Sequence, residues 1–355
     1  MKEVLTRWYQ RYLSEEEAVI LLVMLTVAFV VMLAFGEILA PVFVAVILAY
    51  LMQGVANVLR QRGLPAELSV AVSTLLAMGG FFAVLFGLAP LVWRQLVALL
   101  REAPAMIEAG RKVLVTLPEE YPVFFTQQQV NELTTAIQAE MTSVGQLLVT
   151  KGLSSIPSVL ALTVYLILIP LMVFFFLKDR EQLIGWFAGF LPEKRPLLNQ
   201  IWQELNLQFA NYARGKGIEV LIIGVASYAV FAVFSLNYAA LLGLLVGLSV
   251  IVPYIGAALV TIPVVVVAYF QFGVTPDFYW VVGAYLLIQV LDGNVLVPLL
   301  FSEAVNLHPV AIVIAVLFFG GLWGLWGVFF AIPLATLVNA ILSAWPSSDS
   351  LTVPS

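Results

Sequence analysis

The sequence contains no cysteine and only one histidine among its 355 residues. Disulfide bonds, thiolate metal sites and thiol catalysis are therefore excluded, and so is a histidine-rich metal centre. Charged residues are scarce, at 10% of the chain where soluble domains have about 25%. A net charge of −5 also argues against a nucleic-acid partner, which would need a basic surface. We expect no metal, no cofactor and no nucleic acid.

Sequence motifs of common enzyme classes are missing as well. The chain has no Gly-x-x-x-x-Gly-Lys-Ser/Thr phosphate loop, no His-Glu-x-x-His pair and no Gly-x-Ser-x-Gly nucleophile turn. An enzymatic function therefore has no positive support in the sequence.

Apolar residues, by contrast, make up 62% of the chain. About 20 consecutive apolar residues in a helix cross a hydrocarbon core of ~30 Å. Five segments in the first two thirds meet this requirement: 18–35, 38–59, 68–93, 156–177 and 217–236. Only Gly36 and Glu37 separate the first two, which predicts a tight helical hairpin. The pattern predicts an all-α polytopic membrane protein whose main partner is the lipid bilayer.

Two mostly polar regions interrupt these segments, and each shows a helical periodicity. Apolar residues recur at helical spacing within 95–117 and 126–150, and Thr126 with Gln129 forms a capping-box pair. We predict two amphipathic helices that form a water-exposed module over 94–155. The second polar region, 178–216, contains a stripe that is typical of a helix lying along the membrane interface. Its apolar members are Leu198, Trp202, Leu205, Phe209 and Tyr212.

The last third contains two apolar stretches, 238–272 and 309–345, that are too long for a single crossing. Each would exceed ~50 Å as a straight helix. We therefore predict that each bends, either as two spans or as a re-entrant hairpin. The expected bends, which are also candidate gates, lie at Pro253, Tyr254 and Gly256 in the first stretch and at Gly320 and Gly324 in the second.

The chain accordingly divides into five predicted regions. They are a three-span region over 1–93, the extramembrane module over 94–155, the fourth span with its interfacial helix over 156–216, a transport core over 217–345 and a polar tail over 346–355.

Lysine and arginine set the expected orientation. All sixteen lie before residue 217, and they cluster ahead of the first span, after the second and in 178–216. Cytoplasmic loops carry an excess of these residues. The N-terminus and the 178–216 segment are therefore predicted to be cytoplasmic, and the 94–155 module to lie on the outer side.

The principal candidate site is the polar break "QVLDGNVLVP" at 289–298. An aspartate at the centre of a membrane helix costs about 2.5–3.5 kcal/mol, so Asp292 is expected to face a cavity or a partner. Gly293 weakens a helix, and Pro298 cannot donate to the carbonyl of Asn294. We predict an unwound backbone, with Asp292, Asn294 and Gln289 binding a cation, a proton or a polar solute. The alternative is that Asp292 only caps a helix break.

Two further residues are candidates for a transport path. Glu219 lies one turn into the fifth span, where it serves either transport or only the start of a helix. His308 is able to relay a proton near neutral pH, although a histidine before a proline is more often a structural loop residue.

Several of these segments together resemble one known family. Pro253-Tyr254-Ile255-Gly256, the Asn294 and Pro298 pair, Leu307-His308-Pro309 and the glycine-rich 320–327 segment occur in order within roughly 209–342. In this respect the chain resembles the autoinducer-2 exporter (AI-2E) family, also called the PerM permease family. The resemblance implies a bacterial inner-membrane protein of about eight transmembrane segments that assembles as a homo-oligomer, with a pentamer as the expected form. Lys216, after Tyr212-x-x-Gly215, favours the permease branch.

Three functional hypotheses follow. The first is a secondary transporter that exports a small polar solute, which the resemblance extends to autoinducer-2 and quorum sensing. The second is a sodium or lithium/proton antiporter that uses Asp292 and Glu219. The third is a non-transporting membrane scaffold that binds a partner protein through 94–155.

Overall fold

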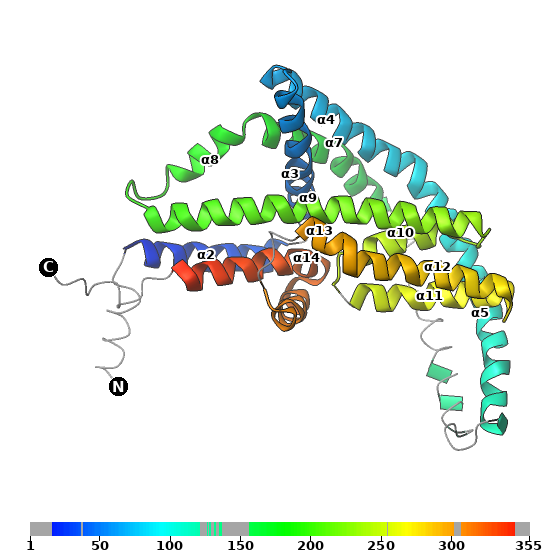
Figure 1. Cartoon of the computed structure of the whole chain (residues 1–355). Coiled ribbons are helices and arrows are strands. Elements are labelled where there is room, and N and C mark those ends of the chain that lie inside the picture. Colours follow the sequence, from blue (N-terminus) through cyan, green and yellow to red (C-terminus); the bar gives the residue numbers. More distant parts are fainter. Residues whose placement is uncertain are drawn as a thin grey trace, which may run out of the picture.

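The computed structural model describes residues 16–36, 38–120, 156–253, 255–301 and 307–344, together with the isolated positions 126, 128, 131, 132, 135 and 136. These residues form helices and no strand (Figure 1). The helices are α2 (Glu16–Phe35), α3 (Ala40–Gln61), α4 (Ala66–Ala83), α5 (Ala89–Glu120), α7 (Ile156–Lys178), α8 (Arg180–Ala188), α9 (Pro196–Val233), α10 (Ala239–Ser249), α11 (Ile255–Phe272), α12 (Pro276–Leu291), α13 (Val297–Phe301) and α14 (Pro309–Ala344). Two π-helical turns, η1 (Val84–Leu88) and η2 (Asp292–Leu296), join helices to one another.

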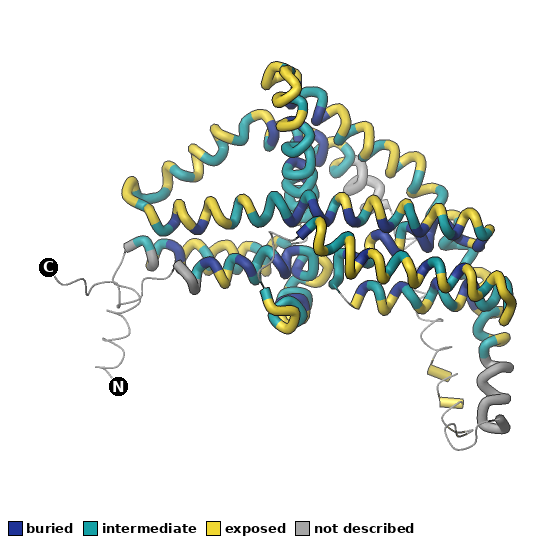
Figure 2. The backbone as a smooth tube through the Cα atoms, viewed as in Figure 1, coloured by how far each residue is buried: buried dark blue, intermediate teal, exposed yellow. Residues whose placement is uncertain are grey.

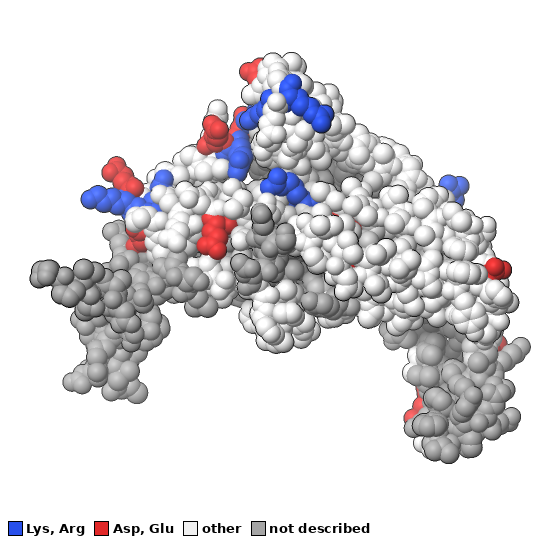
Figure 3. Space-filling view, viewed as in Figure 1, with Lys and Arg blue, Asp and Glu red and all other residues white. Residues whose placement is uncertain are grey.

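Many large apolar side chains lie on the outer surface of the molecule. Within the described part of the chain, six helical segments are long and apolar enough to cross a membrane, and three shorter apolar helices accompany them. Large aliphatic and aromatic side chains lie exposed along these helices. Figure 2 shows that exposed positions recur along most of the helices. Figure 3 shows wide uncharged areas on the same face, with lysine and arginine gathered near the α3–α4 turn and around α8. Because lipid solvates such surfaces, the prediction of an all-α polytopic membrane protein is confirmed.

Helix α9 is the axis of the molecule. It packs against α2, α3 and α14 along one part of its length and against α10, α12 and α13 along another (Figure 1). The prediction of a separate interfacial helix before a fifth span is wrong, since one uninterrupted helix covers both. Leu198 is buried against Leu21 of α2, whereas Trp202 stays exposed. The predicted boundary at residue 216 therefore falls inside α9.

The first two apolar helices do not form the expected hairpin. α2 runs beside α9 and contacts α14, whereas α3 stands across α9 and packs on α4 and α7. Packing against helices from distant parts of the chain outweighs the short connection between these two. The core of this region lies between α3, α4 and α7.

The predicted boundary at residue 93 also falls inside a helix, because α4, η1 and α5 follow one another without a break. Leu96 and Leu99 of α5 pack against the core formed by α9 to α12. The first half of the predicted module is thus a helix that continues the third span and contacts the core formed by α9 to α12. The second predicted helix, 126–150, lies almost wholly outside the described residues.

The first long apolar stretch of the last third is bent, as predicted. α10 ends at Ser249, and α11 begins at Ile255 and packs against it. A Cβ atom on Gly256 would overlap the carbonyl oxygen of Ser249, so the turn needs a residue without a side chain. Pro253 lies in this turn, and Tyr254 is outside the described residues.

The second stretch, α14, is bent at Gly324. This residue has φ 58° and ψ −133°, a conformation that residues with a side chain rarely adopt. Gly320 lies on the other side of the bend, where an added Cβ would be 2.7 Å from Val328 Cγ2. The prediction of bent pairs in both stretches is therefore confirmed. The bends bring several short helical limbs together around the middle of α9.

Candidate functional site

Three polar side chains project from one face of α9. Tyr212, Lys216 and Glu219 are separated by four and three residues, the spacing that places side chains on the same side of a helix. All three are buried, with exposed fractions of 2%, 6% and 1%. Buried ionisable groups of this kind need partners within the protein.

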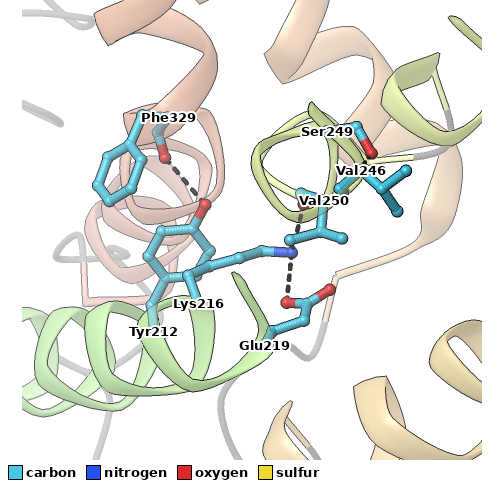
Figure 4. A network of polar contacts seen from close by, with 7 residues as sticks. All are labelled: Tyr212, Lys216, Glu219, Val246, Ser249, Val250 and Phe329. Carbon is cyan, nitrogen blue, oxygen red and sulfur yellow. Dashed lines mark hydrogen bonds and ion pairs between the residues drawn. The ribbon is translucent and has the colours of Figure 1, made fainter. Parts of the chain in front are cut away.

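Lys216 and Glu219 are partners of each other. The ammonium Nζ of Lys216 donates to Glu219 Oε2 at 2.7 Å and to the carbonyl oxygen of Val250 at 2.8 Å (Figure 4). The Phe301 ring covers another side of the ammonium, with its centroid 5.1 Å from Nζ, within the range of a cation–π interaction. A charge-assisted pair with these additional contacts is the arrangement that makes a buried charge tolerable.

Tyr212 connects α9 to the second limb of α14. Its hydroxyl donates to the carbonyl oxygen of Phe329 at 2.9 Å (Figure 4). That carbonyl would normally accept from residue 333, but Pro333 has no N–H. Tyr212 therefore satisfies a carbonyl that the proline leaves without its helical donor.

Asp292, the first residue of η2, lies across from the polar face of α9. Its exposed fraction is 8%, and its Oδ1 atom has no hydrogen-bond partner among the described residues. An unpaired buried carboxylate oxygen is costly, and a π-helical turn of this kind often marks a functional site. Asp292 therefore remains a candidate for contact with a ligand.

The expected unwinding at this position is wrong. The backbone stays helical through 291–301, and Val297 N–H donates to the carbonyl of Asp292 five residues earlier. This wider turn lies directly before Pro298, whose ring cannot fit a regular α-helical turn without disturbing it. The backbone carbonyls thus mostly stay within the helical hydrogen-bonding pattern. The polar groups that α12 and η2 offer to a ligand are therefore side chains rather than freed carbonyls.

A cavity of about 430 Å³ joins these groups. The α9 residues Tyr212, Lys216 and Glu219 form one wall, and Gln289 and Asp292 form the other. Pro253 at the α10–α11 bend, Gly293, Phe301 and apolar residues from α14 complete the lining. The bent stretches and the polar break, which are far apart in sequence, therefore meet around one pocket.

The other predicted residues divide between the pocket and the surface. Gln289 lines the cavity, and its buried Nε2 has no acceptor among the residues the structure describes. Asn294 is exposed and donates to the carbonyl of Val290 in its own helix at 2.8 Å. Pro298 is exposed on the same short segment. Asn294 therefore does not reach the ligand position expected for it.

His308 lies apart from the pocket. It is exposed, and its Nδ1 accepts the backbone N–H of Val310 at 3.2 Å, at the start of α14. Gly320 and Gly324 shape the bend of α14, and neither lines the cavity. In the described part of the chain, no group of three or more histidine or acidic residues is positioned to hold a metal ion.

Lys216 was missed as a site residue, because a basic residue ahead of an apolar run is counted with the cytoplasmic loop. The structure places it inside α9 and 6% exposed. The sequence pattern places Tyr212 only in an interfacial stripe. The spacing of Tyr212, Lys216 and Glu219 on one helical face was the signal that could have grouped them.

Comparison with known proteins finds one matching family model and several similar sequences. The family model described as AI-2E family transporter matches residues 19–347. PerM from Escherichia coli (strain K12) is 44% identical over 98% of this chain and 99% of its own length. YueF from Bacillus subtilis (strain 168) is 26% identical over 84% of this chain and 82% of its own. The AI-2 transport protein TqsA from Escherichia coli (strain K12) is 27% identical over 52% of this chain and 54% of its own.

Proposed function

The chain belongs to the AI-2E family of transporters, and we propose that it exports a small polar solute by secondary transport through the cavity beside Asp292. Family membership makes it a multi-pass membrane transporter rather than an enzyme. The single observation that supports a solute site at this place is the pair of unpartnered polar atoms in the cavity. Asp292 Oδ1 and Gln289 Nε2 have no hydrogen-bond partner among the described residues.

These two atoms define the kind of solute that fits. A carboxylate oxygen accepts hydrogen bonds and an amide nitrogen donates them. A solute that carries both a donor and an acceptor would satisfy both buried groups and recover the free energy lost by leaving them unpaired. Autoinducer-2 is the first compound to test, since the relative TqsA is named for its transport.

Efflux from proteoliposomes loaded with autoinducer-2 tests this proposal. Asp292→Asn keeps the shape of the side chain and removes a buried charge, so the variant should insert and fold normally. We expect efflux to fall at least about tenfold, corresponding to the loss of one charge-assisted hydrogen bond of ~1.5 kcal/mol or more. Asn294→Ala is the matched control, because Asn294 is exposed and bonds only within its own helix. Wild-type efflux from Asp292→Asn would refute a role for this carboxylate.

A second candidate is a sodium or lithium/proton antiporter. The observation in its favour is that two buried carboxylates, Glu219 and Asp292, line the same cavity. Proteoliposomes containing a pH-sensitive dye distinguish this function from solute export. Proton movement after a sodium pulse would support antiport, and its absence throughout the physiological pH range would exclude it.

The orientation, location and assembly of the chain are part of the proposal. We place the protein in a bacterial inner membrane with its N-terminus in the cytoplasm, on the distribution of lysine and arginine. The structure buries Lys216 within α9, which removes one residue from that count and leaves the clusters before α2 and after α3. We also propose a homo-oligomer, with a pentamer as the form that the family resemblance implies. The third hypothesis, a membrane scaffold that binds a partner protein through 94–155, stays a prediction.

A further inference from the structure

Helix α10 ends inside the apolar part of the molecule. It has 11 residues, which span about 16 Å at 1.5 Å per residue, roughly half of a hydrocarbon core. The carbonyl groups at the C-terminal end of a helix carry a partial negative charge. Val250, directly after α10, therefore presents its carbonyl oxygen at a point where a cation is favoured.

Glu219 supplies a second oxygen at the same point. The Glu219 carboxylate and the Val250 carbonyl come from different helices and meet at one atom, Lys216 Nζ, at 2.7 and 2.8 Å (Figure 4). In secondary transporters, carbonyl groups at the C-terminal end of a half-helix coordinate sodium ions, and an ionised carboxylate adds a negatively charged oxygen beside them. In this chain a covalently attached ammonium holds that position.

We propose that Lys216 occupies a built monovalent-cation site, so that this transporter carries its own cation and works without sodium. Lys216, Glu219 and the Val250 carbonyl then form a closed position that no free ion enters. Asp292 and Gln289, whose Oδ1 and Nε2 lack partners among the described residues, stay available for the solute. The transport part of this inference rests on the proposed function, whereas the cation-binding part does not.

Removing the ammonium should convert the closed position into a sodium site. In Lys216→Met, the Glu219 carboxylate and the Val250 carbonyl still face the space that the Lys216 ammonium fills in the wild type. A cation that enters this space restores the charge balance and stabilises the folded protein by mass action. If the Lys216–Glu219 pair were only structural, Lys216→Met would be destabilised and sodium would not restore its stability.

Thermal unfolding of the purified full-length protein in detergent, in sodium chloride and in choline chloride, distinguishes these cases. We expect the wild type to unfold at the same temperature in both salts. We expect sodium to raise the Tm of Lys216→Met by on the order of 5 °C over choline. The double variant Lys216→Met/Glu219→Gln, which lacks the carboxylate, should lose this difference. Lys178→Met, the same change at an exposed lysine at the end of α7, should show no sodium-specific shift.

Several outcomes would overturn the proposal. A sodium-specific Tm increase in the wild type would contradict a protein that works without sodium, and this measurement needs no variant. A folded Lys216→Met protein without a sodium response would show that the pair is only structural. Lys216→Gln takes its place if Lys216→Met does not fold, with the same expectation. Because unfolding measures no transport, a failure here is distinct from normal efflux by Asp292→Asn, which would refute the proposed function instead.

Discussion

The hydroxyl of Tyr212 lies 2.9 Å from the carbonyl oxygen of Phe329, the carbonyl that Pro333 leaves without a helical donor. The two residues are more than a hundred positions apart in sequence, yet this bond fixes the second limb of α14 against the middle of α9. The cavity beside Lys216 and Asp292 has Tyr212 in its wall. The bond therefore supports the geometry of the site as well as the packing of two helices.

Tyr212→Phe tests the contribution of this bond. The variant keeps the buried ring and leaves the Phe329 carbonyl without a donor. We expect a loss of about 1–3 kcal/mol in unfolding free energy, the cost of an unsatisfied buried polar group. Chemical or thermal unfolding in detergent measures it. Tyr279→Phe, at a tyrosine with 61% of its surface exposed, should unfold like the wild type, and an equal loss in both variants would contradict this account.

We expect single and double substitutions of the buried Lys216–Glu219 ion pair to differ strongly in their effect on the free energy of unfolding. Glu219→Gln leaves the Lys216 ammonium buried without its counter-charge, which costs about 3–5 kcal/mol. Replacing both partners, in Lys216→Met/Glu219→Gln, removes both buried charges and should recover most of that loss in choline chloride. A double variant as unstable as Glu219→Gln would mean that the two charges do not stabilise each other in the folded protein.

The α10–α11 turn predicts intolerance at a single glycine. In Gly256→Ala the new methyl group would overlap the Ser249 carbonyl, so the turn must open. We expect a destabilisation of about 3 kcal/mol or more. Gly283→Ala in α12 is the matched control, because its Cβ meets no atom within 4 Å and alanine favours a helix. Equal stability of the two variants would argue against a tight turn here.

His308 provides a test of the proton-relay hypothesis. Its exposed position and its bond to Val310 N–H indicate a role at the start of α14 rather than in the cavity. Asparagine accepts the same kind of helix-end hydrogen bond, so His308→Asn should transport at the wild-type rate with an unchanged pH dependence. A shifted pH profile of efflux would restore the histidine as a relay.

Much of the fold was accessible from the sequence. Hydropathy located the apolar helices, and the excessive length of 238–272 and 309–345 revealed their bends at Gly256 and Gly324. Hydropathy and segment length could not predict the helix boundaries near Lys216. A polar segment before an apolar run has the same pattern whether it ends in water or is buried between helices, so the full length of α9 required the contacts themselves.

The candidate site was likewise predictable in part. A carboxylate within an apolar run made Asp292 a candidate, because an ionisable residue inside a membrane helix is a functional-site hypothesis by default. Its surroundings could not be inferred, because the partners of Lys216 come from residues 3 and 34 positions away. The π turn also escaped prediction, since Gly293 and Pro298 are equally compatible with an unwound backbone and with a widened helical turn.

The unbroken course of α9 has a mechanical consequence. With no proline after its first turn, the helix behaves as a rod of about 57 Å. The exposed Trp202 lies in the N-terminal half of this helix, and Lys216 lies near its middle. A displacement of the N-terminal part of α9 would therefore tilt the whole helix and move the Lys216 ammonium with it.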